Sequence, residues 1–149
     1  MKSLVIYDSY FGNTEKVAKT VAAELETIPK HVSEFKNSEL EVIDLLIVGS
    51  PTRAFSPSVN IKNFLNELPS IDGIKVGAFD TRMDVKDDIP GILKFFVKIF
   101  GYAADPILKK LEKRGGERVL EPVGFYVKDT EGPLKDSEIE RAKEWVKGI

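Results

Sequence analysis

The stretch "SLVIYDSYFGNTEKVAKTVA", residues 3–22, decides the fold class of this chain. Its first five residues form a near-continuous apolar run, which is typical of a strand buried on both faces of a parallel sheet. A polar turn that contains Gly12 follows, and from Asn13 onward the apolar residues recur at helical spacing. A strand that passes through a short turn into a helix predicts the first half of a βαβ unit.

Four further stretches carry strand patterns. Two are short apolar runs like the first, and a third is a weaker alternating run that fits an edge strand. The fourth contains Pro122, which suits the opposite edge of the sheet because proline has no N–H to donate. In chain order, the four predicted strands cover residues 30–36, 44–50, 75–80 and 118–127.

Helical patterns separate these strands. The helix after the third strand is expected to begin with Ser56 as its cap and Pro57 in its first position. The last helix begins with a capping-box pattern of Ser137 and Glu140. Strands that alternate with helices predict right-handed crossovers, and hence a three-layer, doubly wound, five-stranded parallel α/β sheet in one domain that spans residues 1–149.

Composition excludes several classes of function. The net charge of -2 argues against a nucleic-acid partner. The chain has no cysteine, which excludes thiol catalysis, and its single histidine makes a protein-built metal site improbable. That residue, His31, is expected on the surface of the edge strand, away from the ligand loops. Without an export signal or an apolar run of about 18 residues, the expected location is cytoplasmic.

In a doubly wound sheet, ligands bind beyond the carboxyl ends of the strands, which directs attention to the loops at 8–14, at 51–57 and from 81 onward. In the first loop, backbone N–H groups at a helix N-terminus favour an anion such as phosphate. Ser9, Asn13 and Thr14 could add side-chain donors. The loop matches neither a P-loop nor a dinucleotide fingerprint. Taken alone, it fits an ordinary helix start equally well.

Three segments together resemble the flavodoxin family: "SYFGNTEKVA" its phosphate loop, "LLIVGSPTRAFSPSVNIKNFL" its third strand with the loop over one face of the flavin, and "VGAFDTR" its fourth strand with the loop on the other side. The resemblance spans the chain in the short form of the fold. It implies one noncovalent FMN and the sheet order 2-1-3-4-5. Phe11 departs from the family pattern, since it replaces a hydroxyl that would contact the phosphate.

The resemblance also assigns roles to individual residues. It gives the phosphate to the first turn, the ribityl chain and the ring to the second loop, and the pyrimidine side of the ring to the third. Phe55 is the candidate for stacking on the ring, where many flavodoxins have tryptophan. Tyr102 could reach the flavin or pack in the core. The implied site is Ser9, Tyr10, Phe11, Gly12, Asn13 and Thr14, then Ser50, Pro51 and Thr52, then Arg53, Ala54 and Phe55, then Asp80, Thr81 and Arg82, and Tyr102.

The function that the resemblance implies is electron transfer between redox partner proteins. One alternative is a flavoenzyme of this fold that reduces a quinone or resembles menaquinone-dependent protoporphyrinogen oxidase. Another is an interaction module without flavin. Arg53 and Arg82 would raise the redox potential of the flavin if they lie near the ring, and otherwise they are solvated surface residues.

Residues 83–107, "MDVKDDIPGILKFFVKIFGYAADPI", form a longer loop than the family has at that place. Its apolar residues predict a helix at 92–100 that cannot remain exposed to water. It could pack over the flavin site, form a homodimer interface through residues 89–101, or touch a membrane or a quinone. Two lysines are too few for a helix that lies on a membrane, so membrane contact is disfavoured.

Overall fold

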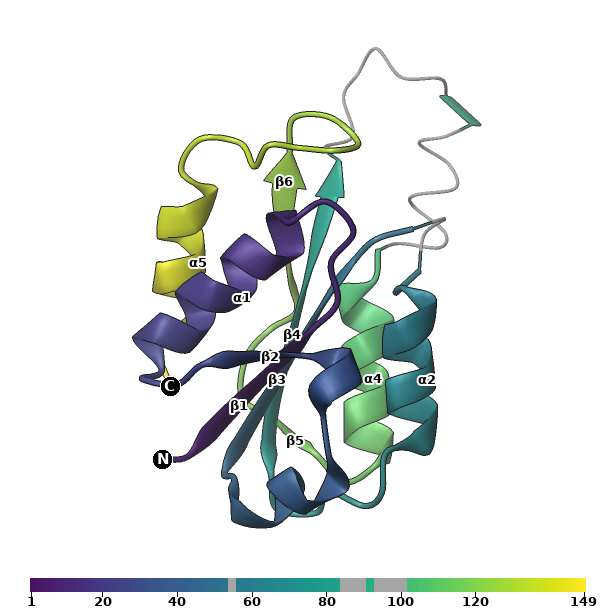
Figure 1. Cartoon of the computed structure of the whole chain (residues 1–149), viewed down its shortest axis with the longest axis vertical. Helices are drawn as coiled ribbons and strands as arrows, with labels where there is room; N and C mark the ends of the chain where they lie inside the picture. The colour runs from purple at the N-terminus through teal and green to yellow at the C-terminus, as the bar shows by residue number, and fades with distance from the viewer. Residues whose placement is uncertain (54–55, 84–90, 93–101) are drawn as a thin grey trace.

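The computed structural model describes residues 1–53, 56–83, 91–92 and 102–149. Its centre is a parallel sheet in the order β2-β1-β3-β4-β5, with β6 also paired to β4 (Figure 1). This arrangement confirms the predicted doubly wound α/β fold with the order 2-1-3-4-5. The strands are β1 Ser3–Tyr7, β2 Pro29–His31, β3 Leu45–Pro51, β4 Lys75–Met83, β5 Glu117–Arg118 and β6 Val123–Val127.

Among the described residues, α-helices cover both faces of the sheet. α1 (Asn13–Glu24) and α5 (Glu138–Val146) lie on one face, and α2 (Val59–Glu67) and α4 (Ala104–Lys113) lie on the other (Figure 1). Two 3-10 helices, η1 (Val32–Glu34) and η2 (Asn37–Val42), follow β2.

The central strands supply both cores of the domain. In β1, Leu4 and Ile6 enter the core beneath α2 and α4, whereas Val5 and Tyr7 enter the core beneath α1 and α5. Side chains of a strand alternate between faces, so an unbroken apolar run can serve both cores at once.

The predicted fifth strand is two strands. β5 pairs with the start of β4 and β6 with its end, so both occupy the same edge of the sheet. The prediction of one strand over 118–127 was wrong at residues 119–122. Pro122 has no N–H to continue the ladder, and Leu120 packs against Gly77, where even a methyl group would lie 3.1 Å from it.

The predicted edge strand is shorter than expected. β2 ends at His31, and the chain then turns into η1, whereas the alternating pattern predicted strand to residue 36. The His31 ring causes this early end, because its Nδ1 accepts the Ser33 N–H at 3.1 Å and caps the 3-10 turn.

Both predicted helix caps were wrong in detail. Ser58, not Ser56, caps α2, since its hydroxyl accepts the Ile61 N–H. Ser137 does precede α5, but it has a φ of 72° and makes no capping hydrogen bond.

None of the helices in the described ranges is long and apolar enough to cross a bilayer. The apolar helix predicted at 92–100 and the homodimer interface predicted at 89–101 lie outside the described residues, apart from Gly91 and Ile92.

Candidate functional site

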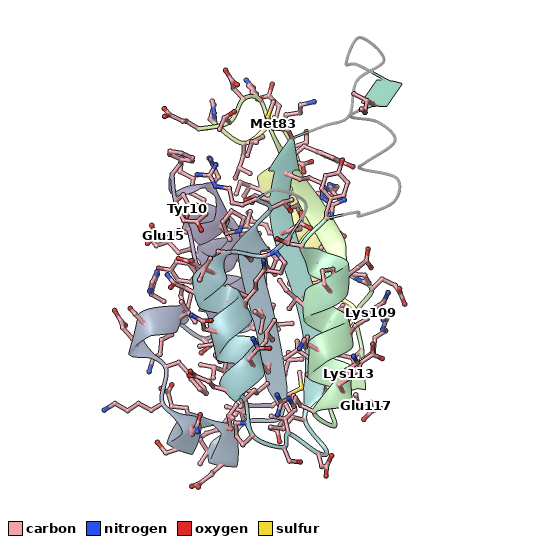
Figure 2. The ribbon with its side chains drawn as sticks, turned by 90° about the vertical axis from the view of Figure 1, so that its right-hand side faces the viewer. Tyr10, Glu15, Met83, Lys109, Lys113 and Glu117 are labelled. Carbon is pink, nitrogen blue, oxygen red and sulfur yellow. The ribbon has the colours of Figure 1, made fainter. Side chains whose placement is uncertain are left out.

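A pocket of about 240 Å³ lies where β1, β3, β4 and β6 end. Tyr10 and Met83, which both line it, lie at the same end of the molecule in Figure 2. All three predicted loops contribute to its wall. The predicted residues that line it are Ser9, Tyr10, Phe11, Asn13, Thr14, Pro51, Thr52, Arg53, Thr81 and Arg82.

The turn before α1 presents backbone donors to this pocket. Gly12 adopts a φ of 91°, a left-handed conformation that glycine reaches without strain, and its N–H donates to the Ser9 hydroxyl oxygen at 3.0 Å. The first N–H groups of a helix have no partner within it. Within the part of the chain that the structure describes, no acceptor satisfies the N–H groups of Tyr10, Phe11, Asn13, Thr14 and Glu15.

Two side chains that were predicted as free donors are already engaged. The Asn13 amide donates to the Glu131 carbonyl at 3.1 Å, and the Thr14 hydroxyl lies 2.7 Å from that of Thr81. Both contacts cross between loops that are far apart in sequence. They therefore hold the turn in place, and its donors without an acceptor among the described residues are backbone N–H groups.

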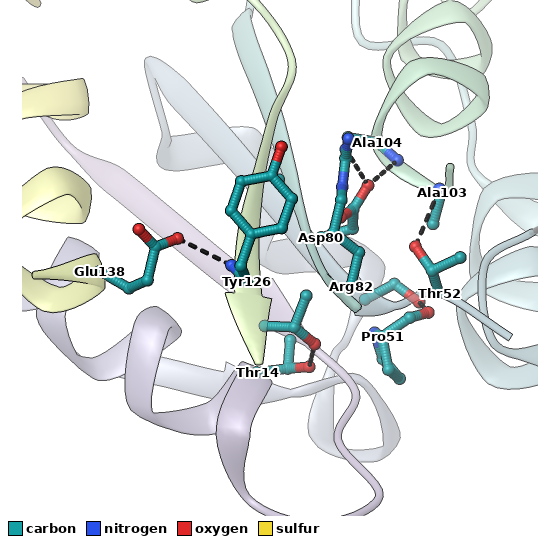
Figure 3. Close-up of polar contacts among 12 residues, drawn as sticks. Thr14, Pro51, Thr52, Asp80, Arg82, Ala103, Ala104, Tyr126 and Glu138 are labelled. Carbon is teal, nitrogen blue, oxygen red and sulfur yellow. Dashed lines mark hydrogen bonds and ion pairs between the residues drawn. The ribbon is translucent and has the colours of Figure 1, made fainter. Parts of the chain in front are cut away.

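Hydrogen bonds of Ser50 and Thr52 fix the second loop. Ser50 is buried and does not line the pocket. Its hydroxyl donates to the carbonyl of the next residue and accepts the Ser58 N–H, each at 2.9 Å. Thr52, in the pocket wall, donates its N–H to the Thr81 carbonyl and accepts the Ala103 N–H on its hydroxyl oxygen (Figure 3). Ala54 and Phe55, predicted at the flavin ring, lie outside the described residues.

Asp80 lies beneath the pocket rather than in its wall. Its carboxylate is fully buried and accepts two hydrogen bonds from Arg82, at 2.7 Å each, and one from the Ala104 N–H at 2.9 Å (Figure 3). Burial raises the pKa of Asp80, while the Arg82 guanidinium and the Ala104 N–H oppose that rise. Asp80 thus ties the start of α4 to the end of β4.

The two arginines of the wall are in different electrostatic states. Arg82 is paired with Asp80, and Tyr102 stacks on its guanidinium at 3.8 Å, so it is not a solvated surface residue. Arg53 lies over the rings of Tyr10 and Phe11, at 4.5 and 5.4 Å from their centroids. No carboxylate among the described residues forms an ion pair with Arg53.

His31 lies closer to the loops than expected. Its Nε2 is 3.2 Å from Oδ1 of Asp8, the first residue of the loop that leads into α1. Nδ1 accepts the Ser33 N–H at 3.1 Å, an arrangement in which Nε2 is the ring nitrogen that can donate a hydrogen bond to Asp8. Asp8 is 3% exposed and also accepts the Ser9 N–H, whereas its Oδ2 has no partner in the described chain. The prediction of a surface histidine away from the loops was wrong in its placement.

A fourth loop, after β6, was not foreseen. Val127 and Thr130 line the pocket with Met83, and the Thr130 hydroxyl donates to the Met83 sulfur at 3.8 Å. The signal was available, since the carboxyl ends of all parallel strands meet at one edge of the sheet. The last strand has a weaker apolar pattern that includes Pro122, and the pattern by itself does not mark where the strand ends.

Comparison with known proteins gives a consistent result. Residues 4–94 match the family model described as a flavodoxin domain. A flavodoxin of Aquifex aeolicus (strain VF5) is 37% identical over 73 residues, which are 45% of this chain and 40% of that protein, so the match spans less than half of that relative.

Solved structures agree in fold. A short-chain flavodoxin associated with a non-canonical PDU bacterial microcompartment superposes with a TM-score of 0.75 at 19% identity, over 100% of this chain and 97% of that one. Flavodoxin 2 from Bacillus cereus in its oxidised form gives a TM-score of 0.71 at 21% identity, over 97% and 94%. With a sheet of matching order, a pocket at its carboxyl edge and a family model that covers most of the sequence, the chain belongs to the flavodoxin domain family, whose members bind FMN.

Proposed function

We propose that this protein is an FMN-binding electron carrier, a single domain over residues 1–149 that exchanges electrons with redox partner proteins in the cytoplasm. The flavin, when bound, supplies the one- and two-electron chemistry. The chain itself supplies the binding site, the orientation of the ring and the exclusion of water.

One observation carries this proposal. Five backbone N–H groups, from Tyr10 to Glu15 with the exception of Gly12, lack acceptors in the described chain, at the N-terminus of α1 beside the pocket. An anion with several oxygens, such as a phosphate monoester, would satisfy them, and the helix dipole adds to the attraction. The residues present therefore fit the phosphate of FMN. Thr52, Arg53 and Arg82 line the pocket beside this turn, where the rest of the cofactor would lie.

The chemistry of the wall favours a carrier over an enzyme with its own substrate. The described residues that line the pocket include no histidine, carboxylate, lysine or cysteine. General acid–base catalysis uses a side chain within hydrogen-bond reach of the substrate, most often a histidine or a carboxylate, with a pKa suited to that task. The wall offers hydroxyls, arginines and an amide instead. The quinone-reducing alternative depends on residues 84–101, almost all of which lie outside the described chain.

Binding is tested by adding FMN to the purified protein and measuring flavin fluorescence and visible absorption before and after desalting. We expect quenched fluorescence and flavin bands that survive desalting. The loaded protein should then be reduced by dithionite and reoxidised by an external one-electron acceptor. A protein that stays colourless with excess FMN would overturn the proposal. Rapid turnover of NAD(P)H with a quinone would replace the carrier by the flavoenzyme. Sedimentation analysis of the same sample tests the proposed homodimer through residues 89–101.

A further inference from the structure

We propose that Arg53, in the second loop, binds the phosphate of the ligand together with the backbone N–H groups of the turn before α1. The inference rests on the proposed function, since the phosphate is that of FMN. The site would therefore neutralise a phosphate dianion with a side-chain cation as well as with backbone N–H groups.

The position of Arg53 is fixed at both ends. Its backbone N–H donates to the Ser56 carbonyl at 2.8 Å, and its own carbonyl accepts the Ser56 N–H at 2.9 Å, so the backbone is held in a closed bridge. At the other end, the guanidinium lies over the rings of Tyr10 and Phe11. These are two of the residues whose backbone N–H groups have no acceptor among the described residues. The cation therefore contacts the side chains of two residues of this turn, and all three residues line the same pocket.

Arg53 also differs from the other charged residue of the described pocket wall, because it has no carboxylate partner there. The described wall of the pocket contains two charged side chains, Arg53 and Arg82. The guanidinium of Arg82 already makes two hydrogen bonds to the buried Asp80, so its charge is largely cancelled for a ligand. Arg53 has no ion-pair partner within the described ranges. Its planar guanidinium can give two parallel hydrogen bonds to one phosphate.

This arrangement gives Phe11 a use. In the resemblance, Phe11 stands where a hydroxyl would contact the phosphate, and the turn loses one donor. Here the ring of Phe11 instead supports the Arg53 guanidinium at 5.4 Å. A cation on an aromatic face keeps its charge and gives up less hydration than one in an ion pair, so it remains available to an anion. Arg53 thus replaces the missing donor.

The test compares FMN with riboflavin, which has the same ring and ribityl chain but no phosphate. Dissociation constants of both are measured by fluorescence quenching for wild type, Arg53→Gln and Arg53→Lys. Lys109→Gln is the matched control, since it removes one positive charge from an exposed position on α4, far from the pocket (Figure 2). Each series is repeated at low and high salt, because an exposed cation acts through a screened interaction.

We expect Arg53→Gln to raise the dissociation constant of FMN about 10-fold at low salt, as the loss of a hydrogen bond between charged groups predicts. The dissociation constant of riboflavin should stay within about 2-fold of the wild-type value. Arg53→Lys should recover part of the lost affinity for FMN. High salt should reduce the difference in FMN affinity between wild type and Arg53→Gln. Lys109→Gln should match wild type. Equal weakening of FMN and riboflavin, or no weakening of FMN, would overturn the role assigned to Arg53.

Inorganic phosphate separates a failure of this inference from a failure of the proposed function. If the wild type bound no FMN, the proposed function would fall. The role of Arg53 would then be decided by thermal unfolding with and without inorganic phosphate, with chloride at equal ionic strength as the reference. Stabilisation by phosphate that Arg53→Gln removes would support the role. Stabilisation that is equal in both proteins, or absent from both, would overturn it.

Discussion

Arg82→Met would leave a carboxylate buried without its cation, and the structure gives the size of the effect. Asp80 is fully buried and the Arg82 side chain is 15% exposed, so their ion pair is shielded from water. Removing one partner of a buried pair costs about 3–5 kcal/mol. Because the Ala104 N–H still donates to Asp80, we expect the lower end, about 3 kcal/mol at pH 8. That loss lowers the melting temperature by roughly 6–12 °C in a domain of this size.

The loss of folding stability in Arg82→Met should increase as pH rises. Burial already raises the pKa of Asp80, and without the opposing Arg82 guanidinium it rises further. A carboxyl whose pKa is higher in the folded state contributes stability below its unfolded value, about 3.9, and loses it as pH rises through the folded value. The variant should therefore be less stable relative to wild type at pH 8 than at pH 5.

Thermal unfolding followed by circular dichroism at pH 5 and pH 8, without added ligand, measures both effects. The double variant Asp80→Asn/Arg82→Met has no charge left at these two positions, so it should be more stable than Arg82→Met at pH 8 and lose the extra pH dependence. The reasoning is refuted if Arg82→Met lies within about 0.5 kcal/mol of wild type at pH 8, well below the cost of an unpaired buried charge. It is also refuted if the double variant is no more stable than the single one.

Two further predictions concern the turn and the last helix. Gly12→Ala should lower the free energy of unfolding, measured with urea, by about 1–2 kcal/mol, because the φ of 91° at Gly12 is left-handed. Gly148→Ala is the control, since Gly148 has equally open space and an ordinary φ, and it should change the free energy of unfolding little. Equal costs would mean that backbone strain is not the cause. Burial would raise the pKa of Glu138, but hydrogen bonds from Arg141 and the Tyr126 N–H lower that pKa overall. The contribution of Glu138 to folding stability is therefore present above about pH 4.3 and is lost as pH falls. Glu138→Gln should therefore destabilise by about 1–3 kcal/mol at pH 7 and approach wild type in acid, and a pH-independent difference would contradict this.

The fold was largely predictable because its signals are local. The apolar runs at β1, β3 and β4 are buried on both faces, and such runs have few alternatives to a parallel sheet. The errors fell at element ends. Ser56 and Ser58 are both plausible caps in the sequence, and the choice depends on Ser50, which holds the Ser58 N–H from an adjacent strand. A residue eight positions away is not visible to a local pattern.

The candidate site was predictable in outline and not in its contacts. Sequence patterns left the turn with Gly12 open between an anion site and an ordinary helix start, and in the structure five of its N–H groups lack an acceptor among the described residues. The pairing of Asp80 with Arg82 was not expected, because residues two apart on a strand point to the same face but need not meet. The stacking of Arg53 on Tyr10 and Phe11 joins two loops that only the packed sheet brings together.

By itself, the sequence determined the alternation of strands and helices and the doubly wound class, because these follow from apolar periodicity and turn chemistry over a few residues. The tertiary structure alone decided which charges are cancelled. Asp80 neutralises Arg82, whereas Arg53 remains without an ion-pair partner in the described chain. The physical reason is that electrostatic state depends on distance and burial, and both are set by strand register and loop packing between residues that are remote in sequence.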